Sequence, residues 1–109
     1  MSEAAFSIHR SQSGVLDLSG ILGFTTVGSA YLEVKQILIE TRAITVLNLA
    51  GLRSTDSAGL ACLLAWRAEA QQRGRQLELR GLPDNARALA QVCEVEGLLT
   101  QPGLNGRSV

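Results

Sequence analysis

The sequence predicts a single α/β domain with the element order β-β-α-β-α-β-α. Two segments of helical periodicity, at residues 26–41 and 57–73, alternate along the chain with short strand-like segments. Strand–helix–strand units favour right-handed crossovers and parallel pairing, whereas a hairpin at the start of the chain requires an antiparallel pair. We therefore expect a mixed sheet with helices packed mainly on one face.

The first two elements read as a β-hairpin. Residues 6–8 and 15–18 alternate between apolar and polar side chains, as half-buried strands do. The segment between them, at residues 10–14, is polar and ends in a glycine. This composition suits a hairpin connection.

A loop and a helix follow the hairpin. Gly20 and Gly23 indicate the loop, and from about Thr26 to Thr41 the apolar residues recur at helical spacing. Gly28 weakens the first turn, so the sequence leaves the start of this helix open.

The second half of the chain predicts two strands and two helices. Residues 44–49 form a nearly continuous apolar run, which is typical of a strand buried on both faces. A helix over residues 57–73 follows, with Gly74 as its C-terminal cap. Residues 76–80 alternate as a further strand, and residues 83–92 form the third helix.

The composition indicates one domain, spanning residues 1–109, in the cytoplasm. A chain of 109 residues with 46% hydrophobic content can bury a single core. Ten basic residues balance ten acidic ones, which argues against binding nucleic acid through overall charge. The chain shows neither a secretion signal nor the ~20 consecutive apolar residues of a membrane span, so we expect no direct membrane insertion. Cys62 and Cys93 are expected to be buried free thiols, and the tail is expected to fray from about residue 101.

The most informative segment is Asp-Ser-Ala-Gly-Leu at residues 56–60, where the predicted strand and loop lead into the second helix. Ser57 lies at the helix N-terminus, where backbone N–H groups lack partners and the helix dipole is positive. Two interpretations are open at this point: a hydroxyl that caps the helix, or a hydroxyl placed to carry or contact a phosphate.

The same helix is apolar around most of its circumference. Leucines form one stripe, alanines a second, and Cys62 with Trp66 a third. Either neighbouring elements bury the helix deeply, or part of its surface docks on a partner. We expect Trp66 to contribute to such a docking surface.

The sequence contains none of the common catalytic motifs that we searched for. It lacks a phosphate-binding loop, a dinucleotide fingerprint and a zinc-protease motif, and we expect neither a metal nor a cofactor. His9 is the only histidine, and the residues around Ser57 do not form a hydrolase nucleophile elbow. Two hypotheses remain: a binding module that docks through the Asp56–Leu60 turn, which these absences favour, and a small enzyme with Ser57 as nucleophile.

Several of these segments together resemble STAS domains, the family of anti-sigma factor antagonists and their relatives in transporters. The similarity rests on the strand at residues 44–49, the spacer at 52–55 and the Asp-Ser-Ala-Gly-Leu element at 56–60. It extends to residues 16–20, to Gly74 and to Leu82-Pro83, and so covers nearly the whole chain. The resemblance implies four or five mixed strands with helices on one side.

Within the family the chain most resembles the MlaB-type subunit of an ABC transporter for phospholipid trafficking, which maintains outer-membrane lipid asymmetry. The apolar stretch at residues 60–66 and the segment at 21–27 carry this similarity. Many anti-sigma antagonists have an acidic residue shortly after the glycine equivalent to Gly20, and residues 21–23 supply none.

The resemblance implies a non-catalytic protein whose partner is the ATPase subunit of the transporter, with a location peripheral to the inner membrane. The alternative is an anti-sigma factor antagonist controlled by a kinase that phosphorylates Ser57. The residues expected to bind the partner lie around the start of the second helix and along it: Thr55, Asp56, Ser57, Ala58, Gly59, Ala61, Cys62 and Trp66.

Overall fold

The computed structural model describes residues 6–92 of the chain. The expected fraying of the tail and the state of Cys93 lie outside the described residues. The elements, in chain order, are β1 (Phe6–Gln12), β2 (Val15–Leu22), α1 (Val27–Glu40), β3 (Val46–Thr55), α2 (Ser57–Gln72), β4 (Glu78–Arg80) and α3 (Asp84–Val92).

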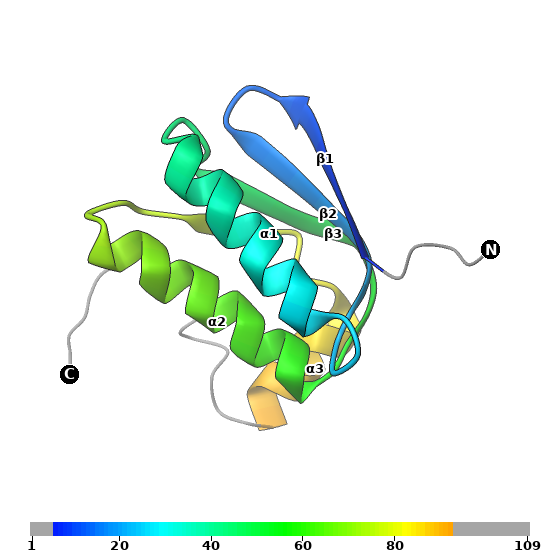
Figure 1. Ribbon diagram of the computed structural model, residues 1–109. Helices are drawn as coiled ribbons and strands as arrows, with labels where there is room; N and C mark the ends of the chain where they lie inside the picture. The colour runs from blue at the N-terminus through cyan, green and yellow to red at the C-terminus, as the bar shows by residue number, and fades with distance from the viewer. Residues whose placement is uncertain (1–5, 93–109) are drawn as a thin grey trace.

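These elements form a mixed four-stranded sheet with three helices, and the predicted order and fold class are confirmed. The strands lie in the order β1-β2-β3-β4. β1 and β2 pair antiparallel, whereas β3 is parallel to both of its neighbours. Helices α1 and α2 lie side by side over one face of the sheet (Figure 1). This arrangement brings the ends of β2 and β3 and the starts of both helices to one edge of the domain.

β2 and β3 are longer than the sequence predicted. Gly20 was expected to begin a loop, but β2 continues to Leu22 and Gly20 adopts a φ of 92° within the strand. Residues 52–55 were expected to be a spacer, but β3 continues to Thr55. Both strands are longer because they pair with each other. In the parallel ladder Gly20 pairs with Leu52 and Leu22 with Thr55, so each strand supplies the hydrogen-bond partners that extend the other.

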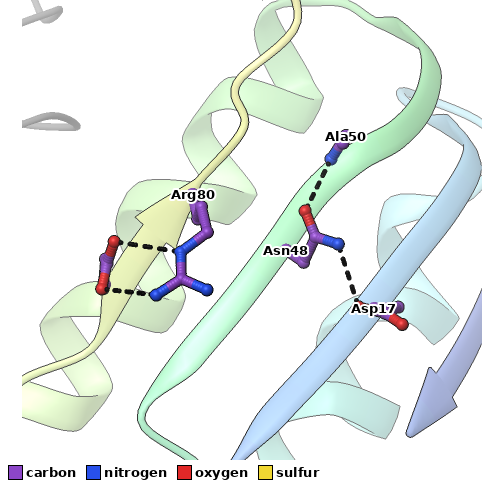
Figure 2. Close-up of polar contacts among 5 residues, drawn as sticks. Asp17, Asn48, Ala50 and Arg80 are labelled. Atoms are coloured by element: carbon purple, nitrogen blue, oxygen red, sulfur yellow. Dashed lines mark hydrogen bonds and ion pairs between the residues drawn. The ribbon is translucent and has the colours of Figure 1, made fainter. Parts of the chain in front are cut away.

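The sheet face away from the helices is polar, which corrects the expectation that the central strand is buried on both faces. Leu47 and Leu49 are fully buried, whereas Asn48 between them is only half-buried. Figure 2 shows its amide: Nδ2 donates to Asp17 Oδ1 on β2 at 3.0 Å, and Oδ1 accepts from the Ala50 N–H at 3.2 Å. The helices therefore pack against only one face of β3. On its other face, Asn48 makes hydrogen bonds instead of packing against a second layer.

The segment that follows α2 makes hydrogen bonds to the C-terminal ends of both α1 and α2. Gly74 has a φ of 72°, and the Arg75 N–H donates to the Ala70 carbonyl at 2.9 Å, as in a Schellman cap. The predicted glycine cap is therefore confirmed. The Arg75 guanidinium then reaches the end of α1, where it donates to the carbonyl of Leu38 and, at 2.8 Å, to that of Ile44.

Candidate functional site

The candidate site lies where the β2–α1 loop meets the N-terminus of α2. The register of the parallel ladder ends with Leu22 opposite Thr55, so the segments that follow the two strands leave the sheet together. In Figure 1 the loop before α1 lies beside the first turn of α2. Residues that are more than thirty positions apart in the sequence therefore form one surface.

Asp56 ties these two segments together. It is the N-cap residue of α2, and its Oδ1 accepts from the Gly59 N–H at 3.0 Å. Its Oδ2 accepts from the Phe24 N–H in the loop at 2.9 Å. These two hydrogen bonds, the one from Phe24 first, lower the pKa of the Asp56 carboxyl below its ordinary value. The side chain is consequently an anion near neutral pH.

Two glycines allow the close approach of these segments. A Cβ on Gly59 would overlap the Leu22 carbonyl oxygen and would lie 2.9 Å from the Thr55 Cγ2. A Cβ on Gly23 would lie 2.8 Å from Asp56 Oδ2. Gly59 was predicted to contact a partner, but it is buried, and its role is to let α2 pack against the end of β2.

Ser57 is the first residue of α2 and is exposed. Asp56, rather than Ser57, caps the helix, so the interpretation of Ser57 as the cap is wrong. Within residues 6–92 the Ser57 hydroxyl has no hydrogen-bond partner. The hydroxyl is therefore available for contact with another molecule.

The other predicted partner-binding residues divide into two groups. Asp56 and Ala61 are exposed and Ala58 is partly so, and they lie with Ser57 on the surface. Thr55 is buried, and its Oγ1 finds no hydrogen-bond partner within the described part of the chain.

Cys62 and Trp66 belong to the core, which corrects their expected place on a docking surface. Trp66 is 0% exposed, and its Nε1 donates to the Tyr31 carbonyl of α1 at 3.2 Å. Cys62 is 5% exposed, and burial raises the pKa of its thiol to about 12. Because α1 packs along α2, the face of α2 that carries Cys62 and Trp66 is covered within the domain, whereas Ala61 and Ala68 of the alanine stripe are exposed.

Phe24 is the residue of this surface that the sequence analysis did not single out. Its side chain is 81% exposed, and its N–H is the group held by Asp56. Periodicity cannot select a loop residue, so the available signal was only an aromatic residue between a glycine and two threonines.

Among residues 6–92, the sheet separates Ser57 from His9, the only histidine of the sequence. His9 lies on β1 opposite Asp17, in the polar face of the sheet, whereas Ser57 follows the far end of β3. Across residues 6–92, no three His, Cys, Asp or Glu side chains gather as metal ligands would. In the same range, no helix is long and apolar enough to cross a bilayer.

Comparison with solved structures finds the same fold in an anti-sigma factor antagonist. The unphosphorylated form of SpoIIAA superposes with a TM-score of 0.60 at 19% identity, covering 80% of this chain and 82% of that one. The phosphorylated form, described as a Bacillus cell fate determinant, gives a TM-score of 0.63 at 17% identity and covers 89% of each chain. At these identities the similarity establishes the fold alone. A search of curated proteins finds no match.

Comparison with family models identifies the sequence more closely. The model described as "Mlab, STAS domain" matches residues 7–100, which is most of the chain. The matched region includes all of the candidate site, from the β2–α1 loop to the first turns of α2. This chain belongs to the STAS domain family.

Proposed function

We propose that this protein is a non-catalytic subunit that binds and regulates the ATPase of an ABC transporter for phospholipid trafficking and outer-membrane lipid asymmetry. The observation that carries the proposal is the surface around Ser57: an exposed residue with a hydroxyl at the N-terminus of a helix that Asp56 caps and joins to the β2–α1 loop. The MlaB-type description of the matching family model is the support for a transporter partner. In this proposal the protein is cytoplasmic and reaches the inner membrane only through its partner.

The second candidate function is an anti-sigma factor antagonist switched by phosphorylation of Ser57. The fold similarity to SpoIIAA, whose solved structures include a phosphorylated form, supports it. The exposed Ser57 hydroxyl would also be accessible to a kinase. Against it, residues 21–23 lack the acidic residue that many antagonists carry there.

Co-purification from the native cell separates the two candidates. A tagged copy of the protein is isolated, and the proteins bound to it are identified and then purified. We expect an ABC-type ATPase whose hydrolysis rate changes when the purified protein is added. A bound kinase that transfers phosphate to Ser57 would instead support the antagonist function.

The location gives an independent test. If the ATPase is the membrane link, the protein sediments with the inner membrane in cells that contain the ATPase and is released when the ATPase is deleted. Retention on the membrane after that deletion would contradict the proposal.

A further inference from the structure

We infer that Phe24 is an aromatic anchor for the ATPase subunit, and that its ring enters an apolar pocket of that partner next to the group that contacts Ser57. This inference rests on the proposed function. It adds a residue of the β2–α1 loop to a surface that the sequence placed only on α2.

Phe24 combines an exposed side chain with a backbone that hydrogen bonds hold in place. Its side chain is 81% exposed, while its own N–H is bonded to Asp56. The Gly23 N–H donates to Thr26 Oγ1 at 2.9 Å, and that hydroxyl donates to the Ile21 carbonyl at 2.9 Å. The backbone N–H of Thr26 also bonds to the Gly23 carbonyl, at 2.9 Å. The loop is thus closed on both sides of Phe24.

An exposed aromatic side chain on an ordered backbone suits recognition, because little conformational freedom is lost when it binds. Binding costs free energy for every side chain and loop that must be ordered at the interface. Here the backbone is already ordered and the ring has only two rotatable bonds, so little ordering remains. A single exposed apolar residue is ordinary in itself, and what distinguishes Phe24 is that its N–H is bonded to Asp56, the residue that precedes Ser57.

Phe24 is also linked to Ser57 through Asp56. One carboxylate, Asp56, holds both the Phe24 N–H and the first turn of the helix that carries Ser57. Exposed positions near the starts of the two helices include small residues: Ala61 on α2 and Gly28 on α1, where an added Cβ would meet nothing within 4 Å. Small side chains at these positions let a partner approach the helices closely. The partner surface therefore needs an apolar pocket and an adjacent polar group for the hydroxyl.

The test compares the affinity of the purified ATPase subunit for the wild-type protein and for Phe24→Ala. We expect the alanine variant to bind about thirtyfold more weakly, which corresponds to about 2 kcal/mol. Phe24→Tyr keeps the ring and should retain most of the affinity. Ile39→Ala is the control, because Ile39 is also exposed but lies at the opposite end of α1. Thermal unfolding of each variant verifies that the fold is kept.

The outcomes separate this inference from the proposed function. Wild-type binding with an unaffected Phe24→Ala variant overturns the inference and leaves the proposed function in place. Equal weakening by Phe24→Ala and Ile39→Ala also overturns it, because the loss would not be specific to the anchor. Failure of the wild-type protein to bind overturns the proposed function and the inference together.

Discussion

Two glycine-to-alanine substitutions in helices should change stability in opposite directions. Gly59 lies in α2, where an added Cβ would overlap the Leu22 carbonyl oxygen and approach Thr55 Cγ2 to 2.9 Å. Gly28 lies in α1, where an added Cβ meets nothing within 4 Å. Alanine favours helix over glycine at both positions, so the difference between the variants measures the packing of α2 against β2.

The magnitudes follow from these contacts. Overpacking costs up to about 3 kcal/mol, and the helix preference of alanine returns about 1 kcal/mol, so Gly59→Ala should lose about 2 kcal/mol. Gly28→Ala should gain about 0.5 kcal/mol, mainly because its unfolded chain has less conformational freedom. Urea unfolding followed by circular dichroism measures both. A Gly59→Ala variant as stable as the wild type would refute the close approach of α2 to the end of β2.

Three further predictions concern side chains around the site. Trp66→Ala should cost about 3–5 kcal/mol and lower the unfolding temperature sharply, because the indole fills the core; an unchanged unfolding temperature would contradict this. In a Cys93→Ser background, the buried Cys62 thiol should resist a thiol reagent at about pH 8 until urea is added, and rapid labelling of the folded protein would contradict its burial. Hydrogen bonds lower the pKa of the Asp56 carboxyl in the folded protein. Its contribution to stability is therefore complete above the ordinary pKa of about 3.9, and it is lost as the pH falls through the lower pKa of the folded state. The stability advantage of the wild type over Asp56→Asn in urea unfolding should therefore shrink below about pH 4, and a constant advantage would contradict the assignment.

The order of the elements was predictable because each element carries its own local pattern. The helical spacing in α1 and α2 and the Gly74 cap are properties of short segments, and the structure confirms them. The ends of β2 and β3 were not predictable in the same way. Their last residues are strands because they pair with each other, and the sequence of one strand does not report the length of its neighbour.

The candidate site was predictable in part for a similar reason. The motif placed Ser57 correctly at the start of α2. It could not show that α1 covers Trp66, since an apolar helix face looks the same in sequence whether a neighbouring helix or a partner protein buries it. Phe24 was missed because its place in the site depends on contacts between distant segments: the pairing of Leu22 with Thr55 and the hydrogen bond from its own N–H to Asp56.

The most direct test of the account is the affinity of the ATPase subunit for Ser57→Ala and Ser57→Glu, measured by calorimetry. Both variants should fold, because Asp56 supplies the cap and the helix N-terminus tolerates a negative charge. A docked surface would have to desolvate the new carboxylate beside Asp56, so binding should weaken more for glutamate than for alanine. An affinity equal to that of the wild type in Ser57→Glu would contradict the placement of Ser57 at the interface.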